Sequence, residues 1–243
     1  MYKYIEPFGH HVWGSSIGEM WMSLFETALE HGEITYDEGR QRKSLQNVVY
    51  QANNYNLPDK IIEKYAKKKN IDALIHLTFE GKEMHDFDVR PSFSPGAMSY
   101  HARITEGRLL EYVVKRLSSI PESKKAVMSF IRWDDYNAVL DTPYDDYLPC
   151  HTTIQFRLLE QDDRFVMNTI SHFRSIDAFQ KACGDFVVTS MLAEKVKAEL
   201  SNSLPKKIDY GVMMGVITDA HIYEETYEEA KLVINRYKSE SNV

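Results

Sequence analysis

Two alternating segments separated by a short acidic turn limit most strongly what this chain can fold into. Apolar and polar side chains alternate through much of residues 152–175, and Glu-Gln-Asp-Asp at 160–163 interrupts them. A period of two is typical of strands with one buried face. Two such strands on either side of a short polar turn predict an antiparallel hairpin, and residues 124–133 supply a third candidate strand.

Segments with helical spacing of apolar residues surround these strands. Residues 18–32 carry apolar side chains three and four positions apart and end at Gly32, which predicts an amphipathic helix. The other expected elements are helices at 59–69, 107–121, 177–200 and 224–238, strands at 44–52 and 209–223, a polar turn at 36–44 and a loop at 90–104. Without repeats or linkers, residues 1–243 are expected to form one α+β domain: a mostly antiparallel sheet with helices on one face.

Composition excludes several classes of protein. The chain has 243 residues, 43% hydrophobic and 27% charged, with a formal net charge of -7. Duplex-binding proteins normally present a basic face, so a nucleic-acid partner is not expected, although a few arginines in a cleft can still bind a small anion. No apolar run approaches the length of about 20 residues needed to cross a membrane, and the N-terminus has no signal-peptide pattern. Two cysteines do not make a disulfide framework or a zinc site, so we expect a cytoplasmic protein without a metal.

One of the two cysteines, Cys150, lies between Pro149 and His151 just before a predicted strand. A catalytic thiol needs nearby positive charge or a helix N-terminus to favour the thiolate. A free cysteine is more often a small apolar residue buried in the core. On these residues alone, both interpretations stay open.

Two further segments combine polar residues that bind ligands in other contexts. Arg174 ends a predicted strand, and Ser175 and Asp177 follow where a helix is expected. These residues fit a helix cap with a surface arginine, or an anion site at a helix N-terminus. His221 and Tyr223 share one face of a later strand, which fits either a sugar-binding pair or a half-buried sheet edge.

Taken together and in order, these segments resemble the thymidylate synthase family. The family carries Pro-Cys-His before a Gln-Phe strand, then Arg-Ser-x-Asp, then His-x-Tyr. The matching residues here are 149–151 with 155–156, then 174–177, then 221–223. The segments around Arg174 and His221 look most like the archaeal-type branch, and the clear resemblance spans about residues 120–235. The resemblance implies that Cys150 is the nucleophile of a folate-dependent enzyme.

The N-terminal half matches the family less closely. Residues 99–104 look like its Tyr-Gly-x-Arg segment, with His101 in place of the glycine, so Tyr100 would help to order water in the site. Lys124 and Lys125 lie where the family has paired arginines that reach the partner subunit's phosphate site. Arg42, or alternatively Arg40, would correspond to the phosphate loop.

Two features of the family have no clear counterpart in this chain. The active-site glutamate is not placed, and Glu80 and Glu83 are the nearest candidates. The C-terminal residues 236–243 lack the apolar end that closes over folate in the bacterial enzymes. Because of these two departures, the sequence does not show how the folate would be enclosed.

The residue that reads the base differs from the usual one. Family members specific for uracil carry Asn eight positions after the Asp of Arg-Ser-x-Asp, and counting from Asp177 gives Asp185. A carboxyl group accepts from the amino group of cytosine and, when protonated, donates to its ring nitrogen, whereas against uracil it opposes lone pairs. Such a mismatch costs about 1–3 kcal/mol. Asp185 therefore resembles its counterpart in cytidylate hydroxymethylases, unless a gap shifts the count and Asp185 is a solvated helix residue.

The resemblance implies a mechanism and a partner for each group. Cys150 would add to carbon six of a pyrimidine nucleoside monophosphate, and carbon five would take the one-carbon unit of 5,10-methylenetetrahydrofolate, the co-substrate. Water would then give a hydroxymethyl product from CMP or dCMP. The implied contacts are the phosphate for Arg174 and Ser175, the sugar for His221 and Tyr223, the base for Asp185 and the pterin for Asp177. The family also implies a homodimer packed sheet to sheet.

Three alternatives stay open at this stage. The first is a thymidylate synthase that methylates dUMP. The second is a homologue that binds nucleotides without turnover. The third is an unrelated α+β protein in which Cys150 is inert.

Overall fold

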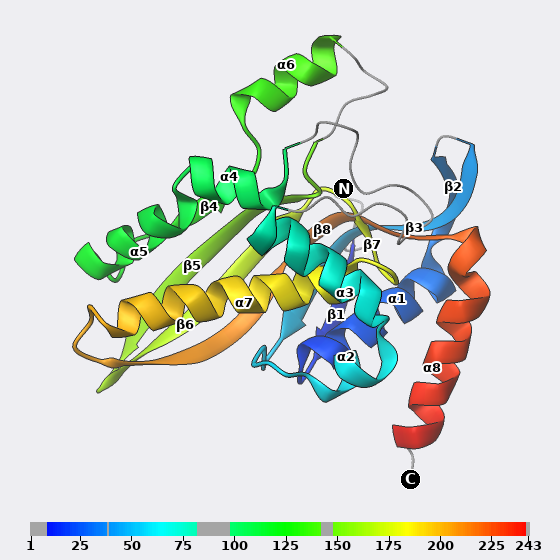
Figure 1. Ribbon diagram of the computed structural model, residues 1–243. Coiled ribbons are helices and arrows are strands. Elements are labelled where there is room, and N and C mark those ends of the chain that lie inside the picture. The colour runs from blue at the N-terminus through cyan, green and yellow to red at the C-terminus, as the bar shows by residue number, and fades with distance from the viewer. Residues whose placement is uncertain (1–8, 38, 82–97, 142–147, 242–243) are drawn as a thin grey trace, which may run out of the picture.

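The computed structural model describes residues 9–37, 39–81, 98–141 and 148–241, which form helices and strands around one sheet (Figure 1). The strands are β1 (His10–Gly14), β2 (Glu33–Asp37), β3 (Arg40–Ala52), β4 (Val127–Ser129), β5 (His151–Gln161), β6 (Arg164–Phe173), β7 (Ile176–Asp177) and β8 (Lys207–Tyr223). The α-helices are α1 (Ile17–His31), α2 (Lys60–Tyr65), α3 (Lys68–Ile75), α4 (Tyr100–Glu106), α5 (Leu109–Ser119), α6 (Trp133–Asp141), α7 (Ala182–Ser201) and α8 (Tyr227–Ser241).

The sheet is mixed rather than mostly antiparallel, which corrects the expectation. Its strand order is β1-β3-β8-β6-β5-β4, with β2 paired to β3 and β7 paired to β8. The pairs β1–β3, β6–β8 and β7–β8 are parallel. A parallel neighbour needs a long crossover connection, and α1 and α7 lie in the crossovers that lead from β1 to β3 and from β6 to β8.

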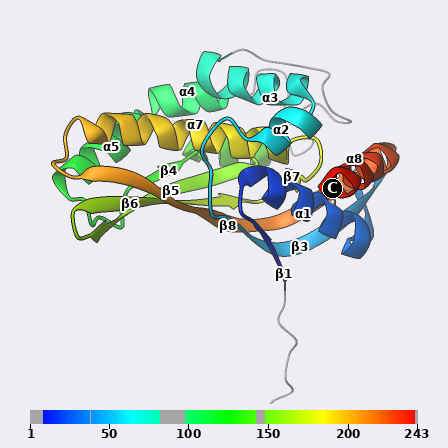
Figure 2. The same cartoon turned by 90° about the horizontal axis from the view of Figure 1, so that it is seen from below.

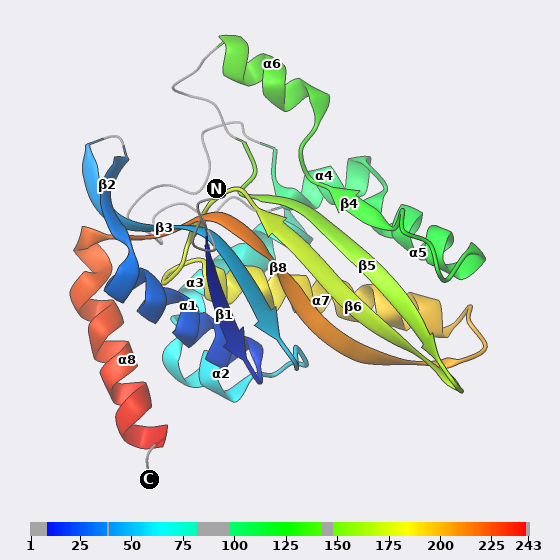
Figure 3. The same ribbon diagram turned by 180° about the vertical axis from the view of Figure 1, so that it is seen from behind.

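In the part of the chain that the structure describes, helices cover one face of the sheet and none lies across the other face. Helix α7 lies along the sheet, with α3, α4 and α5 on the same side of it, as Figure 2 shows. Figure 3 shows strands β1, β3, β8, β6, β5 and β4 from the uncovered side. Phe186 of α7 contacts the rings of Tyr50 and Phe173 on the covered face, at centroid distances of 5.3 and 6.4 Å. These buried aromatic contacts anchor α7 on β3 and β6.

Several predicted elements are confirmed with small changes. The hairpin at residues 160–163 is the β5–β6 turn, where Asp162 has a φ of 45°. The helix expected at 59–69 is divided into α2 and α3, and the helix expected at 177–200 begins only at Ala182. Asp177, the first residue of that predicted helix, instead belongs to the short strand β7. In β7, Ile176 and Asp177 pair with Ala220 and His221 of β8.

Two predictions of irregular structure were wrong in part. The polar turn expected at 36–44 is part of the β2–β3 hairpin, in which β2 ends at Asp37 and β3 begins at Arg40. The loop expected at 90–104 becomes helix α4 from Tyr100 onward, because the hydroxyl of Ser99 caps it by accepting from the amide of Ala102. Residues 90–97 of that prediction lie outside the described ranges. In the described part of the chain, no helix is long and apolar enough to cross a membrane.

Candidate active site

Cys150 lies immediately before β5, at an irregular point of the sheet. The register between β5 and β6 shifts between His151 and Thr153, so the β5 strand carries an extra residue there. Such a bulge bends the strand and changes the direction of neighbouring side chains. The thiol of Cys150 is partly exposed, whereas the other cysteine, Cys183, is buried. Cys150 is therefore accessible and is not a core residue.

Arg174 brings its positive charge directly to this thiol. Its Nη2 lies 3.7 Å from Sγ of Cys150 and donates to the carbonyl of Leu148 at 2.5 Å. Its Nε donates to the carbonyl of Pro149 at 3.2 Å, and its backbone amide donates to the carbonyl of Cys150 at 2.9 Å. The positive charge of Arg174 therefore lies within contact distance of the sulfur atom. The resemblance implies that Arg174 binds the phosphate, and the structure also brings its side chain into contact with Cys150.

Tyr100 and His151 lie next to the segment that carries Cys150. The buried hydroxyl of Tyr100 accepts a hydrogen bond of 3.0 Å from the backbone amide of His151. The imidazole of His151 stacks on Phe173 with a centroid distance of 4.0 Å. Burial lowers the pKa of His151 to about 3, so this ring is neutral at physiological pH. The structure thus links Tyr100 to the residue that follows the thiol.

Ser175, His221 and Tyr223 lie together at the end of β8. The hydroxyl of Ser175 lies 3.4 Å from Nδ1 of His221, and the rings of His221 and Tyr223 meet edge to face at 5.1 Å. Tyr223 donates from its hydroxyl to Oδ2 of Asp37 at 2.8 Å. Burial is the main cause that lowers the pKa of His221 to about 4, although Asp219 opposes it. His221 is therefore a neutral hydrogen-bonding group.

Arg42 joins this cluster from the neighbouring strand β3. It lies opposite Tyr223 in the β3–β8 register, and its Nη1 lies 2.9 Å from Oδ2 of Asp219. Ser44, opposite His221, donates to the other oxygen of Asp219 at 2.5 Å. Sequence reasoning missed Asp37 and Asp219. Asp219 alternates with His221 and Tyr223 along one strand, and that spacing was the available signal.

Asp177, Lys181 and Asp185 follow one another at intervals of four residues. The amide of Lys181 donates to the carbonyl of Asp177 at 3.2 Å, and the amide of Asp185 donates to the carbonyl of Lys181 at 3.0 Å. Asp177 Oδ1 accepts from the amides of Phe179 and Gln180, at 3.0 and 2.8 Å. The charges of Asp177 and Lys181 both act on Asp185, so the three groups lie near one another where the chain enters α7.

The carboxyl group of Asp185 is only 7% exposed, so it is not the solvated helix residue of the alternative interpretation. Its pKa rises from 3.8 to about 7. Burial is the largest cause and the charge of Asp177 adds to it, whereas the charge of Lys181 opposes it. Asp185 therefore keeps its proton to a higher pH than an exposed carboxyl group does.

The remaining predicted residues lie on other elements or beyond the described structure. Lys124 and Lys125 are exposed between α5 and β4, where their carbonyls accept from Gln155 and Tyr112. Glu80 lies at the end of the helical turn His76–Glu80, with Oε1 3.7 Å from Nε2 of His76. Glu83 lies outside the described ranges.

Ion pairs with α1 and α2 hold the C-terminal segment against the body of the protein. Glu240 of α8 accepts from the hydroxyl of Tyr65 at 2.5 Å and pairs with Lys64. Lys238 pairs with Glu26 of α1. Residues 236–241, which the sequence marked as unlike the bacterial tails, are thus the last turns of a docked helix.

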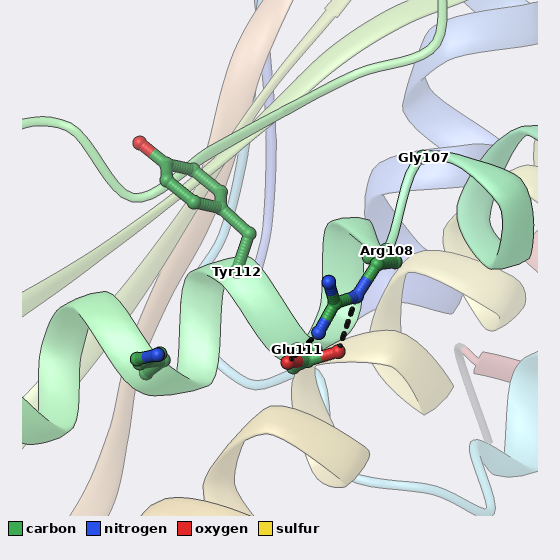
Figure 4. Close-up of a pocket in the computed structure, with 5 residues that line it drawn as sticks. Gly107, Arg108, Glu111 and Tyr112 are labelled. Atoms are coloured by element: carbon green, nitrogen blue, oxygen red, sulfur yellow. Dashed lines mark hydrogen bonds and ion pairs between the residues drawn. The ribbon is translucent and has the colours of Figure 1, made fainter.

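A shallow groove on α5, shown in Figure 4, is a separate surface feature. It is lined by Gly107, Arg108, Glu111, Tyr112 and Lys115, and the guanidinium of Arg108 is paired with Glu111. None of these lining residues belongs to the cluster around Cys150. Within the described ranges, no three His, Cys, Asp or Glu side chains gather as a metal site would require.

The fold and the cluster place a partly exposed cysteine beside an arginine on a mixed α+β sheet, an arrangement typical of enzymes with a cysteine nucleophile. A family model, Thymidylate synthase, matches residues 81–242, which is more than half of the chain. The chain belongs to the thymidylate synthase family, and the resemblance seen in the sequence is confirmed. The comparison with curated proteins found no match. The family carries out one-carbon transfer to carbon five of a pyrimidine nucleotide, with methylenetetrahydrofolate as the co-substrate.

Proposed function

We propose that this protein hydroxymethylates carbon five of a cytidylate, CMP or dCMP, with Cys150 as the nucleophile. The observation that carries the proposal is the buried carboxyl group of Asp185, whose pKa is raised to about 7. A group that exchanges its proton near neutral pH can both donate and accept within a buried site. These properties suit the recognition of cytosine.

The preference between cytosine and uracil depends on how strongly each base accepts the proton of Asp185. Protonated Asp185 accepts from the amino group of cytosine and donates to its ring nitrogen at position three. The corresponding acceptor in uracil is a carbonyl oxygen, which is a far weaker base than that nitrogen. Asp185 therefore holds cytosine more strongly. Ionised Asp185 opposes the lone pairs of the carbonyl oxygen at position four of uracil, and such an unmatched polar group in a buried site costs about 1–3 kcal/mol, or roughly 10- to 100-fold in affinity.

The thiol chemistry follows from the contacts of Cys150. The thiolate adds to carbon six, and the electron pair released at carbon five forms a bond to the one-carbon unit. Carbon five then loses its proton, tetrahydrofolate leaves, water adds to the exocyclic methylene and the thiolate departs. Covalent catalysis divides one difficult substitution into addition and elimination. Arg174 supports the first step by its charge, 3.7 Å from Sγ, and Tyr100 by its bond to the amide of His151.

The remaining polar residues are assigned to the other parts of the ligands. Arg174, Ser175 and Arg42 would bind the phosphate, because forked guanidinium groups and a hydroxyl suit an anion. His221 and Tyr223, which is also bonded to Asp37, would hold the sugar hydroxyls. Asp177, four residues before Lys181, would face the pterin.

We also propose a homodimer formed through the bare face of the sheet. Val49 and Val216 are paired in register across β3 and β8, and both are exposed there, as is Trp13 on β1. Exposed apolar side chains on a flat sheet favour association with another such surface. Lys124 and Lys125 would then reach the phosphate site of the partner. The free thiols of Cys150 and Cys183 fit a reducing cytoplasm.

Tritium release from carbon five tests the function. The protein is incubated with 5-tritiated CMP, dCMP or dUMP, each with methylenetetrahydrofolate, in parallel with Cys150→Ala. Release from a cytidylate but not from dUMP, abolished in Cys150→Ala, is the expected result. Product analysis for the hydroxymethyl group completes the assignment.

Methylation of dUMP is the second candidate, because the matching family model is that of thymidylate synthase. Release from dUMP alone would support it and would remove Asp185 as a reader of cytosine. Binding of nucleotide without any release would indicate a homologue that has lost turnover.

A further inference from the structure

Arg103 and Asp135 form a buried ion pair outside the residues assigned above. Nη1 of Arg103 donates to Oδ2 of Asp135 and Nη2 donates to Oδ1, each at 2.7 Å. Arg103 is 3% exposed. Two parallel bonds of this kind fix the relative orientation of both side chains as well as their distance.

The same guanidinium binds the backbone at two other points. Nη1 donates to the carbonyl of Phe130 at 2.6 Å, and Nε donates to the carbonyl of Met98 at 3.1 Å. Asp135 Oδ2 also accepts from the backbone amide of Arg132 at 2.7 Å. Arg103 therefore ties the start of α4 to the connection between β4 and α6.

A buried ion pair is weak evidence for a purely stabilising role. Removing two charges from water costs free energy that their attraction often only offsets, and apolar residues of similar size commonly serve stability as well. Such a pair does fix the position of the elements that it joins, and one of these elements, α4, also contacts the segment around the thiol. Tyr100 lies three residues before Arg103 on α4, and its hydroxyl accepts from the amide of His151, the residue after Cys150.

We propose that Arg103 is a positioning residue for the Cys150 thiol. Its bonds to Asp135 and Phe130 fix α4, and α4 holds the hydroxyl of Tyr100 against the backbone of His151. The segment that carries the thiol is thus held by Tyr100 on one side and by Arg174 on the other. This role concerns the reactivity of the thiol itself and does not depend on which nucleotide is the substrate.

The test is a double-mutant cycle read out on the thiol. Alkylation of Cys150 by iodoacetamide at pH 7 is followed by mass spectrometry of its peptide in wild type, Arg103→Lys, Tyr100→Phe and the double variant. We expect each single variant to react about fivefold more slowly, the effect of one hydrogen bond. In the Tyr100→Phe background, Arg103→Lys should cause no further decrease, because both changes act through the same contact.

Arg132→Lys is the matched control. Arg132 joins the same two elements through an ion pair with Glu106 at 2.8 Å, but it is much more exposed than Arg103. Its substitution should leave the alkylation rate unchanged. If Arg103→Lys does not fold, as judged by circular dichroism, Asp135→Asn replaces it, because this variant keeps the size of the side chain while losing the charge.

Two kinds of result would overturn the proposal. The first is an alkylation rate in Arg103→Lys that equals or exceeds that of the wild type. The second is an equal decrease with and without Tyr100→Phe, which would assign Arg103 to general stability rather than to the Tyr100 contact.

Discussion

Arg174 holds Cys150 by backbone and side chain at once. Its amide donates to the carbonyl of Cys150 at 2.9 Å, and its Nη2 lies 3.7 Å from the thiol. The same guanidinium binds the two carbonyls that precede Cys150. Its charge and its shape are therefore both used, and only an arginine supplies the planar fork.

Arg174→Lys should lower the rate of tritium release at least about tenfold, because charge-assisted hydrogen bonds of this kind contribute about 1.5–3 kcal/mol each. The lysine keeps one positive charge but cannot bind both carbonyls. Arg164→Lys, at an exposed ion pair with Asp209, is the control and should retain the wild-type rate. Equal rates for Arg174→Lys and wild type would show that the charge alone is sufficient.

Asp185→Asn should reverse the preference between the bases. An amide donates to a carbonyl oxygen and accepts from a ring N–H, which is the pattern of uracil. The ratio of dissociation constants for dCMP and dUMP, measured by calorimetry, should change by at least about tenfold in favour of dUMP. An unchanged ratio would show that Asp185 does not contact the base.

The stability of the protein should also depend on Asp185. Its pKa is raised from 3.8 to about 7, so between these values the folded chain retains a proton that the unfolded chain has released. Stability therefore falls as the pH rises through this window, by up to about 4 kcal/mol. Urea unfolding at pH 4 and pH 8 should show a smaller loss in Asp185→Asn than in wild type. Parallel losses would mean that the carboxyl group is not desolvated.

Lys181 should set the pH at which cytidylate binding is lost. The charge of Lys181 lowers the pKa of Asp185, while burial and the charge of Asp177 raise it. Two other titratable groups, Tyr50 on β3 and Cys183 on α7, interact electrostatically with Asp185. Because the protonated carboxyl group binds cytosine, affinity decreases above the pKa. Lys181→Met raises that pKa, so binding should persist to higher pH. Lys195→Met, further along α7, serves as the comparison and should reproduce the wild-type profile.

A charge on the bare face of the sheet should prevent dimer formation. Val216 lies opposite Val49 in the register, and Val216→Lys would place an ammonium group in the proposed interface. Sedimentation should then report a monomer, because a buried unpaired charge is costly. Leu140→Lys, on the exposed helix α6, should leave the dimer intact. A wild-type protein that is already monomeric would contradict the proposal directly.

The sequence predicted best those elements whose signal is local. The β5–β6 hairpin and α1 follow from periodicity alone, since each residue's neighbours in the chain decide its burial. The segment 36–44 was misjudged because its polar side chains face partners far away, such as Asp219 for Arg42. Parallel pairing of β6 with β8 is likewise a tertiary property that no local pattern carries.

In the candidate site, too, residues with a local sequence signal could be predicted and residues that depend on tertiary contacts could not. Cys150, Arg174 and His221 belong to short motifs, so their association could be predicted. Asp37 and Asp219 have no motif of their own. Asp37 is joined to the site by the hydrogen bond from Tyr223, and Asp219 by its contacts with Arg42 and Ser44. The burial of Asp185, which decides its chemistry, depends on helix packing and could not be read from spacing.

The pairing of β3 with β8 has a consequence for how such chains diverge. The family model begins at residue 81, yet β3, at Arg40–Ala52, is the direct neighbour of β8 and sends Arg42 and Ser44 to Asp219. Strand β3 is therefore constrained by its contacts with β8, although it lies outside the residues that the family model matches. Substitutions at positions 42 and 44 should appear in relatives together with changes at 219, as correlated pairs across the boundary of the recognisable region.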